Sequence, residues 1–289
     1  MEPINIGVIG GSGLYNMPEL TDKTEITVET PYGPPSAPLM VGTLHGQRVV
    51  FLPRHGIGHT LSPSTLPYRA NIYALKALGV RFILSVSACG SLREDYAPGH
   101  IVVPDQLFDY TKSERGGRTF FESGLVAHVS VADPFSPELS AIVAAGVDAA
   151  GGVVHHGGTF VTIEGPRFST KGESHLFRQW GCSIIGMTTS PEAFLAREAE
   201  IAYAAMAHIT DYDVWHDTEE PVTVEAVTRM VQHNIDVIRR ALVEIVRRLD
   251  VNAVYPAHDA LSTALTTDRS QVSAEMLERL RPIVGRYFQ

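Results

Sequence analysis

The chain has 289 residues and a mass of 31.5 kDa, of which 44% are hydrophobic and 19% charged. This length and composition suit one large α/β domain with a sizeable core and exclude a disordered chain. The formal net charge of -9 disfavours nucleic acid and anionic membranes as partners. Two cysteines are too few for a disulfide scaffold. Because no leader or membrane-spanning apolar run is recognisable either, we expect a cytoplasmic protein.

Short apolar runs alternate with segments of helical periodicity along the chain. We expect buried strands at 4–9, 49–52, 82–86, 101–103, 160–163 and 184–187. Helical spacing predicts helices at 68–78, 137–150, 191–200 and 222–249. The alternation predicts an α/β fold, a single domain over residues 1–289 with a central mixed β-sheet flanked by helices. A short amphipathic helix, 272–287, follows a polar stretch, and we expect a C-terminal helical tail at about 269–289.

A glycine-rich turn follows the first strand and includes Ser12. Its glycines allow backbone N–H groups to approach an anion, and the Ser12 hydroxyl adds a donor. The turn is not a dinucleotide fingerprint, because Asn16 stands where the third glycine should fall, and no Walker lysine follows. A plain tight turn is the alternative.

Arg54 and His55 follow the strand at 49–52. A guanidinium can grip two phosphate oxygens in a fork, and an adjacent imidazole can add a hydrogen bond, so we interpret the pair as an oxyanion clamp. A metal site formed by His55 and His59 is disfavoured, because glycines at 56 and 58 oppose a helix there. A structural turn with a surface arginine is the other alternative.

Small residues close the apolar strand that begins at residue 82. Small side chains at the carboxyl end of a strand leave space for a ligand, and Ser87 offers a hydroxyl. Tight packing with a turn at Gly90 would explain the same pattern. Cys89 has no recognisable partner base, which favours a buried structural thiol over a nucleophile.

Asp211 and Asp213 follow another apolar run. If that run is a strand, the two carboxylates point the same way at the edge of the sheet. Two close carboxylates disfavour joint ionisation, so one can keep its proton near neutral pH. A protonated carboxyl presents a donor beside an acceptor, which matches N7 and the 6-amino group of adenine, whereas an asparagine would suit a 6-oxopurine. A solvated acidic turn or a helix N-cap is the alternative.

Six motifs occur together in an informative order: Gly-Gly-Ser-Gly-Leu at 10–14, Pro-Arg-His-Gly at 53–56, Ala-Cys-Gly-Ser-Leu-Arg at 88–93, Thr-Ile-Glu-Gly-Pro-Arg-Phe-Ser at 162–169, Gly-Met-Thr-Thr-Ser-Pro-Glu-Ala at 186–193 and Thr-Asp-Tyr-Asp at 210–213. In this the chain resembles the S-methyl-5'-thioadenosine phosphorylases, which belong to the trimeric purine nucleoside phosphorylase group. The resemblance covers residues 4–248. It implies that phosphate attacks C1' of a 5'-modified adenosine and releases adenine and a 5-substituted ribose 1-phosphate, with no metal or other cofactor.

The resemblance also implies roles for individual residues. Asp211 would donate a proton to N7, and Asp213 would support it. Phosphate would contact Ser12, Arg54, His55, Ser87, Ala88 and Thr188. The nucleoside would contact Phe168, Ser169 and Met187, with Val224 and Val227 lining an apolar 5' pocket and His128 arriving from a neighbouring subunit of a homotrimer. Met187 and Phe168 as core packing, and His128 as an ordinary surface or core residue, are the alternatives.

Departures from the family pattern leave the fine specificity open. Gly186 and Tyr110 replace a frequent asparagine and a usual arginine. A 5'-halo-5'-deoxyadenosine phosphorylase, for chloro or fluoro substrates, is an alternative, because a methylene-sized difference in an apolar pocket is worth only about 1–3 kcal/mol. A 6-oxopurine nucleoside phosphorylase would need asparagine in place of Asp211. A non-catalytic nucleoside-binding protein would not need the arginine, the hydroxyls and the paired carboxylates together.

Overall fold

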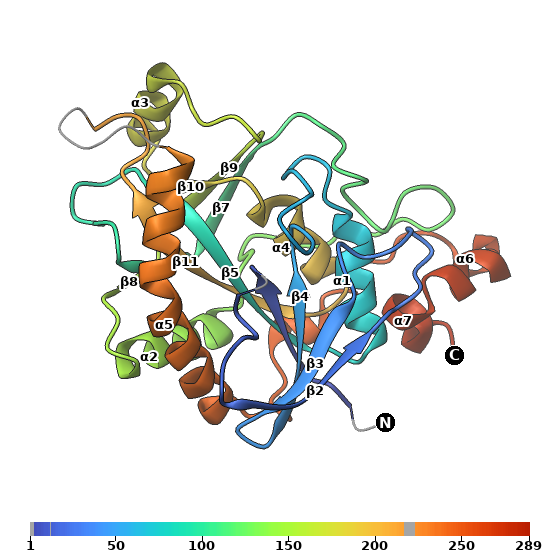
Figure 1. Cartoon of the computed structure of the whole chain (residues 1–289). Helices are drawn as coiled ribbons and strands as arrows, with labels where there is room; N and C mark the ends of the chain where they lie inside the picture. The colour runs from blue at the N-terminus through green and yellow to red at the C-terminus, as the bar shows by residue number, and fades with distance from the viewer. Residues whose placement is uncertain (1–2, 12, 217–222) are drawn as a thin grey trace.

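A computed structural model describes residues 3–11, 13–216 and 223–289 (Figure 1). Within these residues one sheet has the strand order β2-β3-β4-β1-β5-β10-β9-β7, with β11 paired to β5 and β6, and β8 paired to β6. The strands are β1 (Ile6–Gly10), β2 (Leu20–Ile26), β3 (Leu39–Leu44), β4 (Gln47–Pro53), β5 (Phe82–Ser91), β6 (Ile101–Val103), β7 (Gln106–Tyr110), β8 (Val154–His156), β9 (Thr159–Ile163), β10 (Cys182–Gly186) and β11 (Ala202–Asp211). The sheet is mixed, because β1, β4, β5 and β11 are parallel neighbours while β2, β3 and β4 pair antiparallel.

Helices cover the central strands on both faces (Figure 1). The helices are α1 (Tyr68–Ala77), α2 (Pro137–Ala149), α3 (Lys171–Gln179), α4 (Thr189–Glu198), α5 (Val224–Arg248), α6 (Ala274–Arg279) and α7 (Arg281–Val284), with single 3-10 turns at Pro256–Asp259, Arg269–Gln271 and Gly285–Tyr287. One core lies between the sheet and α2 with α5, and the other between the sheet and α1, α4 and α7. The central strands are therefore apolar on both faces, as the uninterrupted apolar runs predict.

Alternate residues of β5 and β11 supply the two cores. Leu84 and Met206 pack toward α5, whereas Ile83 and Ala205 pack toward α1 and α4. The two strands are parallel and in register from Phe82 and Ala202 onward. Their carboxyl ends consequently meet at one edge of the sheet, where side chains following either strand can share a site.

Most of the segments that sequence periodicity missed are short, polar or partly exposed, but β3 is a largely buried strand that was also not predicted. β2, β7 and β8 have exposed or half-buried residues, so they lack the apolar run of a central strand. α3 has a capping box in which the Thr170 hydroxyl accepts from the backbone N–H of Glu173 and the Glu173 carboxylate accepts from that of Thr170. That Thr-x-x-Glu spacing was a usable signal for the start of a helix.

The carboxyl-terminal segment forms two short helices instead of the continuous helix expected over 272–287. Pro282 has no N–H and its ring clashes with the carbonyl four residues earlier, which ends α6 at Arg279. Leu280 and Val284 pack into the core beside α1. Beyond them, Nη2 of Arg286 donates to Oε1 of Glu200, the residue two beyond the end of α4, at 2.8 Å.

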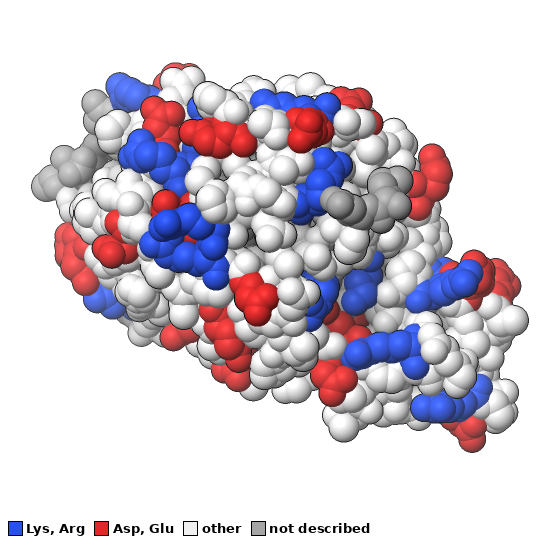
Figure 2. All heavy atoms as spheres, turned by 90° about the horizontal axis from the view of Figure 1, so that it is seen from below, with Lys and Arg blue, Asp and Glu red and all other residues white. Residues whose placement is uncertain are grey.

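Charges of both signs are dispersed over one face of the molecule. In the face that Figure 2 shows, Lys and Arg side chains lie interspersed with Asp and Glu, without a continuous basic area. Among the helices that the structure describes, none is both long enough and apolar enough to cross a membrane.

Candidate functional site

The ends of β1, β4 and β5 build one half of the site. Gly10 pairs with Pro53 in the parallel β1–β4 ladder, and the backbone N–H of Arg54 donates to the Gly10 carbonyl at 2.9 Å. Arg54 therefore follows β4 at the same edge of the sheet as the glycine-rich turn. Ser12, which the sequence placed in this half, lies outside the described residues.

Arg54 is buried and its guanidinium is engaged in an ion pair with Glu192. Nε donates to Oε2 and Nη2 to Oε1, both at 2.8 Å, and both side chains are at most 3% exposed. Burial alone would lower the pKa of Arg54, but Glu192 more than reverses this and raises it. The fork that the sequence suggested for an anion thus faces Glu192 in this structure, and Nη1 is the nitrogen that reaches toward Ser87, at 3.4 Å.

His55 is a neutral imidazole with a fixed tautomer. Its Nδ1 lies 2.9 Å from the Leu61 carbonyl, which can only accept, so Nδ1 carries the proton. Burial lowers the pKa of His55 to about 4, against the opposing effect of that hydrogen bond. Nε2 is consequently an acceptor near neutral pH, suited to the hydroxyl of a hydrogen phosphate ion. His59 stacks on the ring at 4.2 Å, and the described residues include no group of three or more His, Cys, Asp or Glu that could hold a metal.

Two buried hydroxyls face each other, one on β5 and one just after the end of β10. Ser87 Oγ and Thr188 Oγ1 are 3.3 Å apart, and each residue is 6% exposed. Thr188 precedes α4, and its side chain makes no capping hydrogen bond, which leaves it for a ligand. Ala88 is the one exposed residue of β5. The structure thus brings Arg54, Ser87 and Thr188 within hydrogen-bond distance of one another, with Ala88 next to Ser87 on β5.

Asp211 and Asp213 form the second half of the site against Gly90. Asp211 ends β11 and pairs with Gly90 after an irregularity in the ladder. A Cβ at Gly90 would lie 3.0 Å from Oδ1 of Asp211 and 3.2 Å from Cβ of Asp213, so any side chain here would push the two aspartates out of their present positions, and glycine favours this approach. Asp213 lies beyond the strand with φ of 51°, so a turn, and not strand alternation, brings the two residues to the same place.

Burial gives Asp211 the character of an acid. It raises the pKa of Asp211 to about 6, although the Thr210 hydroxyl at 2.6 Å and the Asp213 N–H at 2.8 Å favour the ionised form. Burial also raises the pKa of Asp213, while the hydroxyls of Ser174 and Ser169 act to lower it. Ser169, which the resemblance places at the nucleoside, therefore lies beside Asp213. The pair can keep a proton near neutral pH.

The remaining predicted contacts of the nucleoside lie at the borders of this edge. Met187 follows β10, and its sulfur packs against Gly165, where an added Cβ would be only 2.7 Å away. Phe168 is 39% exposed. Val224 is 67% exposed at the start of α5, and Val227 is half-buried one turn later.

Arg115 is a buried residue of this region that sequence reasoning missed. It is 2% exposed, and its Nη1 donates to the Met187 carbonyl at 2.7 Å and to the Tyr68 hydroxyl at 3.0 Å. Nη2 donates to Glu164 at 3.1 Å. Arg115 therefore fixes the backbone at Met187. Its sequence context, between a glutamate and two glycines, reads as an exposed loop and gave no signal.

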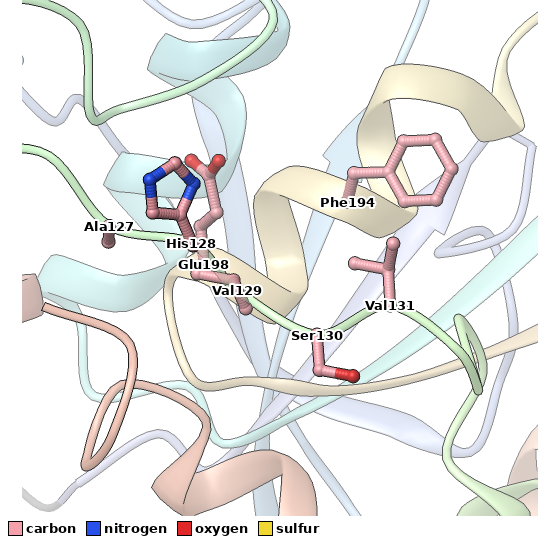
Figure 3. A pocket seen from close by; sticks show the side chains of 7 residues that line it. All are labelled: Ala127, His128, Val129, Ser130, Val131, Phe194 and Glu198. Carbon is pink, nitrogen blue, oxygen red and sulfur yellow. The ribbon is translucent and has the colours of Figure 1, made fainter. Parts of the chain in front are cut away.

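His128 lies in a separate surface cavity of about 440 Å³. Figure 3 shows its ring beside the Glu198 carboxylate, with Phe194 and Val131 toward the other end. Burial raises the pKa of Glu198 to about 7, against hydrogen bonds from Thr119 and Phe120. The structure does not join His128 to the aspartate pair within one chain.

Comparison with known proteins identifies the family. Residues 5–247 match the model of the phosphorylase superfamily. The S-methyl-5'-thioadenosine phosphorylase of Chloroflexus aurantiacus is 55% identical over 288 residues, which cover 100% of both chains. That of Geobacter sulfurreducens is 51% identical over 282 residues, 98% of each chain.

Solved structures agree with these relatives. A methylthioadenosine phosphorylase from an Antarctic soil metagenomic library matches with a TM-score of 0.93 at 48% identity, over 98% of this chain and 99% of that one. The methylthioadenosine phosphorylase of Schistosoma mansoni in complex with adenine matches with a TM-score of 0.82 at 36% identity, over 90% and 99%. The predicted fold, a mixed sheet flanked by helices in one phosphorylase domain, is confirmed. The chain belongs to the S-methyl-5'-thioadenosine phosphorylase family of the phosphorylase superfamily.

Proposed function

We propose that this protein is a pentosyltransferase that cleaves S-methyl-5'-thioadenosine with phosphate, giving adenine and 5-methylthioribose 1-phosphate for purine salvage. The observation that carries the proposal is the buried Asp211 carboxyl, with a pKa of about 6, on the sheet edge that also carries the Ser87 and Thr188 hydroxyls. Ser87 and Gly90, the register partner of Asp211, are three residues apart on β5, or about 10 Å. That span suits an anion beside C1' of a nucleoside and an acid beside its base.

The chemistry follows from the leaving group. Adenine departs poorly as an anion, so bond breaking at C1' is helped by a proton that Asp211 gives to N7. Asp213, beside Asp211, holds the base through the 6-amino group. The sugar gains positive charge in the transition state, and the phosphate dianion beneath C1' both stabilises that charge and attacks it. The bond from C1' to the base nitrogen breaks as the bond from C1' to a phosphate oxygen forms.

Phosphate is held by donors of several kinds. The Ser87 and Thr188 hydroxyls and the backbone at Ala88 donate, Nη1 of Arg54 adds a charged donor, and Nε2 of His55 accepts from the single hydroxyl of hydrogen phosphate. Ser12 would add a hydroxyl from the glycine-rich turn. The reaction needs no metal and no other cofactor, because the phosphate is itself the nucleophile. The two free, buried cysteines support a cytoplasmic location.

A phosphate-dependence assay tests the function. Purified protein is incubated with S-methyl-5'-thioadenosine, 5'-chloro-5'-deoxyadenosine, adenosine or inosine, each with and without phosphate, and free base is quantified. We expect adenine only with phosphate, with the highest kcat/KM for the methylthio substrate. A preference for the chloro substrate would favour the halogen-specific alternative. Inosine as the best substrate, or base release without phosphate, would contradict the proposal.

The acid role of Asp211 predicts a falling pH profile. Asp211 is protonated in a decreasing fraction of molecules as pH rises above its pKa of about 6. At a fixed concentration of the phosphate dianion, kcat/KM for S-methyl-5'-thioadenosine should therefore decline with pH above about 6. A profile that rises steadily from pH 5 to 8 would remove Asp211 as the proton donor.

We also propose a homotrimer in which His128 completes the 5' pocket of a neighbouring subunit. The support is that His128 lines a surface cavity whose lining includes neither Asp211 nor Asp213, while Val224 is 67% exposed. Closed cyclic assembly would bring such surfaces together.

Mixed oligomers test this sharing. In the proposed site, His128 comes from one subunit and Asp211 from its neighbour. Oligomers that contain both His128→Ala chains and Asp211→Asn chains should therefore have some sites in which both residues are native, whereas oligomers of either variant alone have none. Activity is measured in oligomers separated by distinct tags, with sedimentation to establish their size. Absence of complementation in verified mixed oligomers, or full activity of a monomer, would reject the shared site.

A further inference from the structure

All five N–H groups of the Arg54 guanidinium have acceptors inside the protein. Nε and Nη2 donate to the two oxygens of Glu192, and Nη2 also donates to Ser85 Oγ at 2.6 Å. Nη1 donates to the Val86 carbonyl at 2.9 Å and, weakly, to Ser87 Oγ at 3.4 Å. The weak contact is therefore the one N–H that an anion can take over without breaking the pair with Glu192.

Glu192 is itself held from two strands. Oε1 accepts from the Tyr203 hydroxyl at 2.8 Å and from Ser85 Oγ at 2.9 Å, in addition to Arg54. Glu192 is 1% exposed, and Ser85 of β5 is 0% exposed. Tyr203 comes from β11, the parallel neighbour of β5. This network fixes the direction in which Arg54 presents Nη1 toward Ser87 and Thr188.

We propose that Glu192 is the positioning residue of the phosphate site. It holds the Arg54 fork, so that phosphate meets Nη1 together with the Ser87 and Thr188 hydroxyls, and it does not touch the substrate itself. The inference rests on the proposed phosphorolysis for its reaction, but its subject is the binding of phosphate. A carboxylate so near an anion site would repel phosphate if Arg54 did not compensate its charge.

Replacing Glu192 by glutamine gives the first test. The amide nitrogen of glutamine faces an N–H of Arg54, so one of the two fork bonds is lost and the guanidinium is released. We expect the KM for phosphate to rise by about 10- to 100-fold, with the KM for the nucleoside changed by no more than about twofold. A purely structural role would change both KM values alike, and that result, or an unchanged phosphate KM, would overturn the proposal.

Glu244→Gln is the matched control. Glu244 of α5 pairs with Arg247 at 2.7 Å and also with Arg248, so the same chemical change is made in a partly exposed Glu–Arg cluster far from the sheet edge that carries Arg54. Exposed pairs contribute little, and we expect both KM values to be those of the unmodified protein.

The double variant Arg54→Ala/Glu192→Gln gives a second test, in which replacing Glu192 is expected to lower the phosphate KM and not to raise it. Arg54→Ala alone leaves a bare carboxylate beside the anion site. If Glu192 acts through Arg54, removing its charge as well should lower the phosphate KM relative to Arg54→Ala, by about tenfold. A double variant that binds phosphate as weakly as Arg54→Ala, or more weakly, would contradict the proposal.

Tyr203→Phe is a milder change that tests the same network if the Glu192→Gln protein does not fold. It removes one hydrogen bond to Glu192 and leaves both charges paired, and we expect the phosphate KM to rise by about two- to tenfold at an unchanged nucleoside KM. An unchanged phosphate KM in folded Tyr203→Phe would count against the network.

Direct calorimetric titration with inorganic phosphate separates this proposal from the proposed function. If Glu192→Gln weakens phosphate binding but the protein cleaves no nucleoside, the role of Glu192 stands and the proposed function is rejected. If instead the protein cleaves the nucleoside but Glu192→Gln leaves phosphate binding unchanged, the function stands and the role of Glu192 is rejected.

Discussion

Asp211→Asn is expected to lower the turnover of S-methyl-5'-thioadenosine by about 10²–10⁴-fold, the usual effect of losing a general acid. Asparagine can donate a hydrogen bond to N7 but has no proton to transfer. Its amide suits a 6-oxopurine, so the preference should shift from adenine toward hypoxanthine nucleosides. Steady-state kinetics with S-methyl-5'-thioadenosine and inosine at saturating phosphate measure both effects.

The same substitution is expected to stabilise the fold near pH 7. The pKa of Asp211 is about 6 in the folded chain against a model value of 3.8, so the folded state binds its proton more tightly than the unfolded state does. Stability is therefore lost as pH rises from about 4 to about 6, and the full cost, about 3 kcal/mol, is present at pH 7. Asparagine carries no such cost, and denaturant unfolding at pH 4 and pH 7 measures the difference.

Asp236→Asn is the control for both measurements. Asp236 is on α5 with its side chain 74% exposed, 3.7 Å from Arg239, and should affect neither turnover nor stability by much. An Asp211→Asn protein with the unmodified turnover of S-methyl-5'-thioadenosine would remove Asp211 from the mechanism.

Arg54→Ala is the second change with a large expected effect. Losing a charged donor should weaken phosphate binding by about 1.5–3 kcal/mol, seen mainly as a higher KM for phosphate. Breaking a buried ion pair leaves Glu192 without its partner, and this costs the fold about 3–5 kcal/mol. Phosphate-dependent kinetics and urea unfolding measure the two effects separately.

His55→Ala serves for comparison with Arg54→Ala. A neutral imidazole contributes one hydrogen bond through Nε2, so its loss should raise the phosphate KM less. The anion-site assignment of Arg54 would be wrong if Arg54→Ala left phosphate dependence intact while nucleoside affinity collapsed.

Local patterns in the sequence were sufficient to predict the fold. The apolar runs at 82–86 and 160–163 are central strands, because a strand covered on both faces must be apolar throughout. The edge strand β7 escaped prediction because its half-exposed residues follow no such rule. At 272–287 the amphipathic pattern predicts helical structure, but Pro282 divides it into two short helices.

The sequence predicted only those site residues whose function can be recognised from the motif in which they stand. The motifs around Arg54 and Asp211 contain unusual polar residues at strand ends, and the structure places them at one edge of the sheet. Glu192 and Arg115 act through partners far away in the chain, and no spacing rule connects them. Arg54 and Glu192 are 138 residues apart, so their pairing could not be read from sequence.

That separation links the anion site to the cooperativity of the whole domain. Its donors come from β4, β5 and the segment between β10 and α4, so an unfolded chain has no site for phosphate. A ligand that binds only the folded state shifts the unfolding equilibrium, by about 1.4 kcal/mol at ten times its Kd. We therefore expect inorganic phosphate, bound at the proposed site, to protect the entire chain against unfolding before any nucleoside arrives.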